Sequence, residues 1–170
     1  IIENMKTVPY TSHELSQMAL QEISRSRARV IRHRQRYDSD VDYKSTKTDL
    51  WDPPRIVVAC GSLISPYKAA HGRQNSTLKK CHPILEKAYE SKGLRIGHPV
   101  PDNLKNKNGK SYWLPGHCAE PHAVHKLLNI MDWWNPIRIS DIVFGKAFRV
   151  INGMPIAYCN TCKLVFPQLR

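Results

Sequence analysis

Apolar side chains near the N-terminus recur at the spacing of one helical face. The residues that define this face are Leu15, Met18, Ala19, Ile23 and Val30. The segment begins with Thr11-Ser12-His13-Glu14, in which the first hydroxyl and the last carboxylate fit a capping box. The pattern predicts one helix over residues 11–36.

The middle of the chain alternates between strand and helix patterns. The β-branched run at residues 55–60 predicts a buried strand. Residues 62–75 fit either a second strand or a loop, with Gly72 marking a turn. A helix is predicted to begin at Pro83 and to end just before Gly93, because proline favours the first position of a helix and glycine the position just past its end. Its expected inward face carries Leu85, Ala88 and Tyr89.

The last third of the chain contains a loop, two helices and a strand pair. The expected elements are a loop at residues 97–116, a helix at 118–130, strands at 142–151 and 154–158, and a short helix that begins at Cys159. The dipeptide Asn152-Gly153 between the two strands is typical of a hairpin turn.

The length and composition allow one hydrophobic core. The chain has 170 residues, of which 41% are hydrophobic, too few for two full domains. Helix and strand patterns alternate, so the predicted fold class is α/β. We expect a basic helical N-terminal extension at residues 1–50 and a single domain at residues 51–170.

The charge is strongly positive. Lys and Arg number 26 against 14 Asp and Glu, a formal net charge of +12, which predicts a polyanionic partner. Nucleic acid is favoured over an acidic membrane surface or an acidic protein, and plain solubility is the alternative. The charge concentrates in the first helix and the long loop, at Arg25, Arg27, Arg29, Arg32, Arg34, Arg36, Lys105, Lys107 and Lys110. Phosphate contact is favoured for the arginines, with a solvated helix face as the alternative.

Nothing in the sequence predicts a membrane anchor. No stretch approaches the roughly 18 continuous apolar residues that a membrane span needs, and the first residues lack the pattern of a signal peptide. The chain begins at Ile1 rather than methionine, as a processed piece would. Localisation is therefore left open, with a cytoplasmic site of action favoured.

The five cysteines divide into two groups. An odd count argues against a complete set of internal disulfides. Cys60 and Cys81 lie beside apolar segments, where buried free thiols are expected. Cys118, Cys159 and Cys162 have the spacing of metal ligands.

The candidate metal ligands and the candidate proton carrier lie in two short motifs. Cys118-Ala119-Glu120 and the later Cys159-Asn160-Thr161-Cys162 are each predicted to begin a helix. Zinc prefers tetrahedral coordination, and a catalytic site supplies three protein ligands and leaves the fourth position open. Glu120 lies two residues from its neighbouring ligand and is predicted to carry the proton. The ligand-x-Glu and Cys-x-x-Cys pair is typical of zinc-dependent nucleobase deaminases.

Gly116-His117-Cys118-Ala119-Glu120-Pro121 together with Tyr158-Cys159-Asn160-Thr161-Cys162 resembles the cytidine deaminase-like superfamily, over roughly residues 55–168. The resemblance implies a three-layer α/β/α sandwich with a mixed sheet of about five strands, a zinc-dependent deaminase domain at residues 51–170, and conversion of cytosine to uracil. The Cys-Ala-Glu-Pro form resembles deaminase domains of bacterial polymorphic toxins. That likeness implies an immunity protein as a partner and delivery as a secreted toxin fragment.

Two positions depart from the family pattern. Tyr158 stands where the family has proline, and Pro121 stands where free-cytidine deaminases carry a basic residue. His117 and Lys163 could supply that charge. The candidate substrate contacts are His117, Ala119 and Tyr158, which flank the predicted ligands.

Several alternatives stay open. Single-stranded DNA is the favoured substrate, with double-stranded DNA, RNA and free cytidine as alternatives, and cytosine is not separated from adenine. A closed zinc site without catalysis would take its fourth ligand from His117, His122 or His125. Trp133-Trp134 could stack an extruded base, although adjacent tryptophans more often cap a core.

Overall fold

The computed structural model describes residues 8–38, 60–65, 67–74, 77–104, 114–131, 137–149 and 153–169, with only the main chain at 26–38 and 60–65. The elements in chain order are α1 (Ser12–Asp38), β1 (Cys60–Ser65), β2 (Ala70–Arg73), α4 (Pro83–Glu90), η2 (Asp102–Leu104), α5 (Ala119–Ile130), η3 (Ile139–Asp141), β3 (Val143–Phe144), β4 (Ala147–Phe148), β5 (Pro155–Ile156), α6 (Asn160–Val165) and η4 (Pro167–Leu169). In this described part, no helix has both the length and the apolar character needed to cross a membrane.

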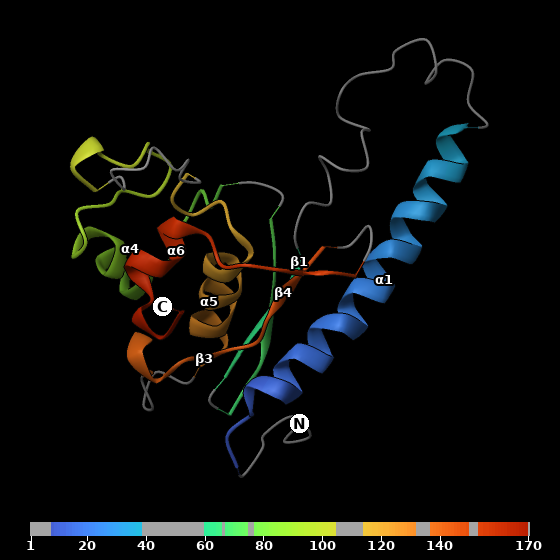
Figure 1. The fold of residues 1–170 in the computed structure, drawn as a ribbon, viewed down its shortest axis with the longest axis horizontal. Helices are drawn as coiled ribbons and strands as arrows, with labels where there is room; N and C mark the ends of the chain where they lie inside the picture. The colour runs from blue at the N-terminus through green and yellow to red at the C-terminus, as the bar shows by residue number, and fades with distance from the viewer. Residues whose placement is uncertain are drawn as a thin grey trace.

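The strands form one small sheet built around β1 (Figure 1). The order is β2-β1-β4-β5, and β3 also pairs with β1. Each pair among the described strands is antiparallel. The predicted combination of helices and strands is confirmed. A parallel pair, which a mixed sheet requires, is not among the described pairs.

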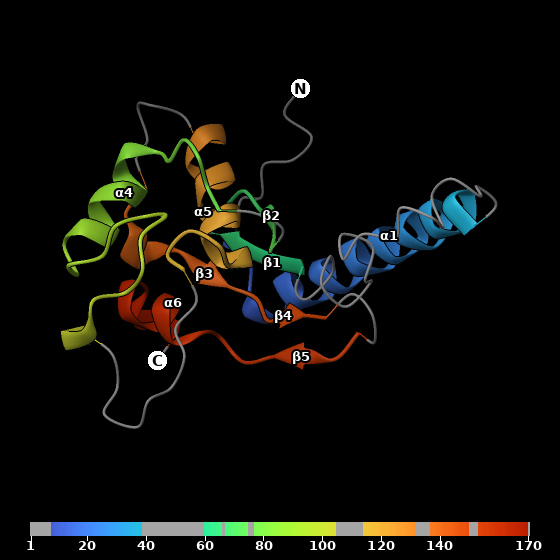
Figure 2. The same ribbon diagram turned by 90° about the horizontal axis from the view of Figure 1, so that it is seen from above.

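Helices lie on both faces of the sheet (Figures 1 and 2). On one face, α1 packs through Leu15, Ala19 and Ile23 against Phe148 of β4. On the other face, α5 lies over β1 and β2, and α4 and α6 pack against the same larger hydrophobic cluster. Its members include Leu85, Tyr89, Val124, Leu127, Phe144, Val165 and Phe166. The first half of α1, which the sequence assigns to an extension, thus shares a hydrophobic cluster with the sheet.

The start of α1 is hydrogen-bonded to the sheet between the end of β3 and the start of β4. The predicted capping box is confirmed, because the main-chain N–H of Glu14 donates to Thr11 Oγ1 at 3.1 Å and that of Thr11 donates to Glu14 Oε1 at 3.3 Å. The next residue, Ser12, donates through Oγ to the carbonyl of Phe144. The main-chain N–H of Lys146 donates to Ser16 Oγ. The hydroxyls of Ser12 and Ser16 therefore form hydrogen bonds with the main chain of Phe144 and Lys146. In a continuous strand, these main-chain groups would instead bond to a neighbouring strand.

Gly72 lies inside β2, so the predicted turn at this residue is wrong. A Cβ atom at this position would lie 1.9 Å from the carbonyl oxygen of Ala119 and 2.6 Å from the main-chain nitrogen of Ala123. The absence of a side chain lets the first turns of α5 rest directly on the strand. The contact fixes the helix end that carries Cys118 and Glu120.

Gly72→Ala is expected to lower the free energy of unfolding by about 3 kcal/mol, because the rigid main chain of α5 must move to admit a methyl group. The comparison variant is Gly93→Ala. Gly93 has a φ of +72° but meets only a Leu104 methyl group, at 3.6 Å, so about 1 kcal/mol is expected from backbone strain alone. Urea unfolding of the three proteins measures both values. Equal losses in the two variants would contradict the close approach of α5 to β2.

Candidate metal centre

Three cysteine sulfurs meet between α5 and α6. Cys118 is the N-cap residue of α5, Cys159 is the N-cap residue of α6, and Cys162 lies in the first turn of α6. Their Sγ atoms all lie within 4.8 Å of one another. The convergence expected from the two motifs is thus confirmed, and these residues could hold a metal ion.

A tight turn delivers Cys118 to the start of α5. Gly116 has a φ of +85°, a conformation that favours glycine. A Cβ atom here would also lie 2.7 Å from Ile96 Cγ2. The carbonyl of Gly116 accepts from the main-chain N–H of Leu78, and the main-chain N–H of His117 donates to the carbonyl of Leu114. Main-chain hydrogen bonds to Leu78 and Leu114 therefore fix the turn that precedes Cys118.

The second motif forms a compact donor pair at the start of α6. Cys159 Sγ accepts a hydrogen bond from the main-chain N–H of Cys162 at 3.3 Å. The spacing of three residues places both sulfurs on one side of the first helical turn. Cys162 is 1% exposed, so its thiol lies away from bulk water.

Charge is shared unequally among the three thiols when no ion is bound. Hydrogen bonds from Cys118 and Cys162 lower the pKa of Cys159 to about 3. Hydrogen bonding to Cys159 raises the pKa of Cys118, and hydrogen bonds to Cys118 and Cys159 raise the pKa of Cys162. One thiolate is thus held by two thiols, and full ionisation of all three needs a positive charge between them.

The donor set fits a tetrahedral zinc ion. Zn–S bonds of 2.3 Å place two sulfurs of a tetrahedral site about 3.8 Å apart. Cys118 Sγ and Cys159 Sγ lie 2.9 Å apart, and no pair exceeds 4.8 Å. The separations thus lie around the required value, and thiolates are ligands that zinc prefers.

Glu120 lies beside this cluster in the first turn of α5. Its side chain is 4% exposed, and Glu120 Oε2 lies 3.6 Å from Cys162 Sγ. Burial, with a smaller contribution from the charge of Cys159, raises the pKa of Glu120 to about 7. The carboxyl group thus lies next to the sulfurs and outside the set of three donors, as the sequence predicts for a proton carrier.

The histidines proposed as a fourth ligand do not join the cluster. Within the described ranges, the donor group close enough for one ion contains the three cysteines and no histidine. His125 Nδ1 accepts from the main-chain N–H of His82, and its Nε2 lies 3.2 Å from Asn129 Nδ2. His117 is half-buried beside Cys118, and His122 is half-buried one turn into α5. None of the three histidines is therefore among the donors that could hold one ion together with the cysteines in this structure.

The candidate substrate contacts have different surroundings. Ala119 is 1% exposed, and its carbonyl faces Gly72. The hydroxyl of Tyr158 donates to the carbonyl of Gly145 at 3.0 Å. Burial raises the pKa of Tyr158 to about 12, with a further contribution from the charge of Glu120. All three candidates flank the ligands, and contact with a substrate remains a prediction.

Several predicted features fall outside the described residues. They are the strand residues 55–59, the lysines Lys105, Lys107 and Lys110, the pair Trp133-Trp134, the turn residue Asn152, and the side chains of Cys60, Arg27, Arg29, Arg32, Arg34 and Arg36. Arg25 is described, and its exposed guanidinium lies 3.7 Å from Glu22. Cys81 is a free, half-buried thiol, and burial raises its pKa to about 11.

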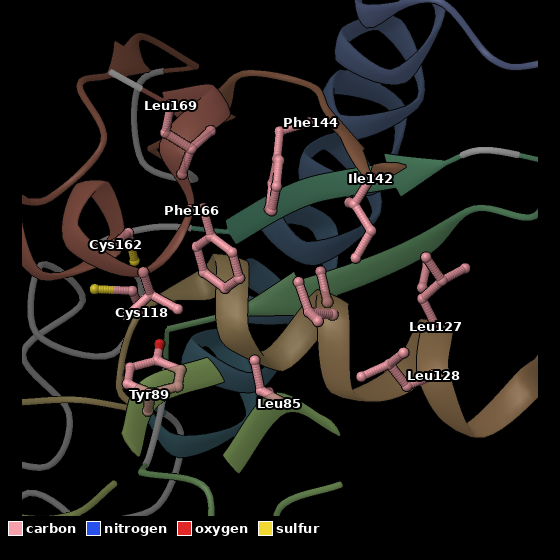
Figure 3. Close-up of a cluster of buried hydrophobic side chains, with 14 of the residues drawn as sticks. Leu85, Tyr89, Cys118, Leu127, Leu128, Ile142, Phe144, Cys162, Phe166 and Leu169 are labelled. Carbon is pink, nitrogen blue, oxygen red and sulfur yellow. The ribbon is translucent and has the colours of Figure 1, made fainter. Parts of the chain in front are cut away.

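Sequence reasoning did not place Tyr89 near the metal ligands. The helical pattern predicts that Tyr89 faces inward, and the residue is 1% exposed. Figure 3 shows its hydroxyl directed toward the sulfurs of Cys118 and Cys162. The sequence placed the polar hydroxyl of Tyr89 on the inward face of a short helix. It did not indicate which groups the hydroxyl would face.

Comparison of the chain with models of known protein families, with curated proteins and with solved structures finds no match.

Proposed function

We propose that this protein is a zinc-dependent deaminase that converts cytosine to uracil in nucleic acid, with single-stranded DNA as the favoured substrate. The observation that carries the proposal is the convergence of Cys118, Cys159 and Cys162 next to the buried carboxyl group of Glu120. The helices on both faces of the sheet support the cytidine deaminase-like sandwich that the two motifs imply.

Each residue of the site has a definite task in this reaction. The three cysteines would hold the metal ion, which would supply a water-derived nucleophile at neutral pH. Glu120 takes a proton from that water and returns it to the departing amino group. A C–O bond forms at C4 of the base and the C–N bond breaks, so water and cytosine yield uracil and ammonia without any redox change.

The burial of Glu120 suits this task. Its carboxyl group is 4% exposed, so protons move between the acid and the reactants with little access for bulk water. Glu120 Oε2 lies 3.6 Å from Cys162 Sγ, so the carboxyl group lies beside the proposed metal ligands. The closed, non-catalytic zinc site gives this buried acid no task.

The net charge supports a polymeric substrate. A formal charge of +12 attracts a phosphate backbone, whereas a small nucleoside has no need for such a field. The target base must be unpaired or flipped out, because its reacting atom is inaccessible inside a stacked duplex.

A substrate panel tests the proposal. Zinc-loaded protein is incubated with single-stranded DNA, double-stranded DNA, RNA and free cytidine, and uracil is measured by mass spectrometry of nuclease digests. We expect uracil in single-stranded DNA, at a rate that falls steeply as salt rises from about 50 to 200 mM. Activity on cytidine alone, insensitive to salt, would make the protein a nucleoside deaminase. No uracil from any substrate would overturn the proposal.

A further inference from the structure

The hydroxyl of Tyr89 has no hydrogen-bond partner among the described residues. Its oxygen is fully enclosed, and no hydrogen bond to any described group reaches it. A buried hydroxyl without a partner is costly, because folding removes its hydrogen bonds to water and returns none. Such a group therefore indicates a partner that arrives with a ligand or ion.

The packing of α4 fixes the direction of the hydroxyl. The ring of Tyr89 meets the ring of Phe166 edge to face, with centroids 6.3 Å apart and planes at 89°. Phe166 follows α6, and its main-chain N–H donates to the carbonyl of Cys162. The same short segment thus positions both the aromatic contact and a predicted metal ligand.

The groups around this hydroxyl are those of the candidate metal centre. Figure 3 shows the oxygen directed toward the sulfurs of Cys118 and Cys162. Burial raises the pKa of Tyr89, and the charges of Cys162, Cys118, Cys159 and Glu120 raise it further. The O–H group of a tyrosine is a hydrogen-bond donor at neutral pH, so its direction toward the sulfurs is the feature that matters here.

The metal-loaded cluster needs such a donor. Three thiolates around a divalent cation leave one excess negative charge in a buried site, with the Glu120 carboxyl group next to it. Hydrogen bonds to ligating groups orient them and tune the metal site. A hydrogen bond from a neutral donor to an ionised acceptor is also stronger than one between neutral groups.

We propose that Tyr89 donates a hydrogen bond to the Cys162 thiolate once a metal ion is bound, and so holds this ligand in place. The inference rests on the metal-binding part of the proposed function and makes no use of the deamination reaction. Tyr89 is thus a positioning residue that acts through a ligand.

The test compares Tyr89→Phe with the wild-type full chain and with the matched surface variant Tyr67→Phe. Tyr67 is 40% exposed, so water can reach this side chain, unlike that of Tyr89. Zinc affinity is measured by competition with a chromophoric chelator. The sulfur-to-cobalt charge-transfer absorption of the Co²⁺-loaded proteins reports directly on the thiolate ligands.

Tyr89→Phe is expected to bind zinc about tenfold more weakly, as usual when a partner of a metal ligand is lost, and to shift the charge-transfer band. Tyr67→Phe should match the wild type in both measurements. Thermal unfolding of the metal-free proteins separates this effect from damage to the fold, because removing an unsatisfied hydroxyl should not lower stability. Wild-type affinity and an unchanged band in Tyr89→Phe would overturn the inference, as would a wild type that binds neither metal. A Tyr89 effect on the metal in a protein that deaminates nothing would sustain the inference and refute the deaminase proposal.

Discussion

Glu120→Gln is expected to lower the rate of cytosine deamination about 1,000-fold while the protein keeps one equivalent of zinc. The substitution preserves the shape of the side chain and removes only its ability to accept and return a proton. A positioned acid or base typically contributes 10²- to 10⁴-fold. Because Glu120 lies outside the group of three sulfur donors, metal content should not change. Single-turnover deamination of single-stranded DNA, with zinc measured on the same samples, gives both values.

Glu22→Gln provides a matched control. Glu22 is 7% exposed, close to the 4% of Glu120, but it lies on α1 and pairs with Arg73 of β2. Loss of this carboxylate should reduce stability and leave the rate per folded molecule unchanged. A non-catalytic zinc module predicts instead that Glu120→Gln retains every function of the protein. Deamination by Glu120→Gln at the wild-type rate would remove Glu120 from the mechanism.

Helices were predictable because their patterns are local. The predicted residues 11–36 correspond to α1 at Ser12–Asp38, and residues 118–130 correspond to α5 at Ala119–Ile130. The capping box and the periodic apolar residues lie within a few positions of the elements they define. The helix predicted to run from Pro83 to just before Gly93 is shorter in the structure and ends at Glu90.

Strands were harder to predict because their limits depend on distant residues. The segment 142–151 has the pattern of one strand, yet it forms β3 and β4 with an interruption at Gly145. A Cβ atom at Gly145 would lie 2.8 Å from Leu15 Cβ. The interruption therefore reflects the packing of α1, some 130 positions earlier in the chain, which no local pattern could reveal.

The candidate site shows the same difference between features set by local sequence and features set by distant packing. The spacing of Cys118, Cys159 and Cys162 contains enough information to predict that they meet, because each lies in a motif at the start of a helix. The position of Tyr89 depends on how α4 packs against Phe166. Ligand sets with motif spacing can thus be predicted from sequence, whereas the groups that support them depend on tertiary packing.

Cys159→Ser is expected to abolish stoichiometric zinc binding and, with it, all deamination. Serine is a good helix N-cap residue, so its hydroxyl can still accept the hydrogen bond that Cys159 Sγ takes from the Cys162 main-chain N–H. The start of α6 is therefore preserved, and the substitution isolates the loss of one metal ligand. If free zinc stands at 1,000 times its dissociation constant, binding stabilises the wild type by about 4 kcal/mol. Chelation should lower the wild-type melting temperature accordingly and leave that of Cys159→Ser unchanged.

Cys81→Ser is the control for this variant, because Cys81 is a free, half-buried thiol that does not belong to the sulfur cluster. It should retain one zinc per chain and the full effect of chelation on melting. The measurements are zinc content by elemental analysis and thermal unfolding with and without chelator. If Cys159→Ser keeps one zinc at wild-type affinity, or if Cys81→Ser loses as much zinc as Cys159→Ser does, then the ion is not held by the three cysteines. The reaction proposed for this site would then lose its source of activated water.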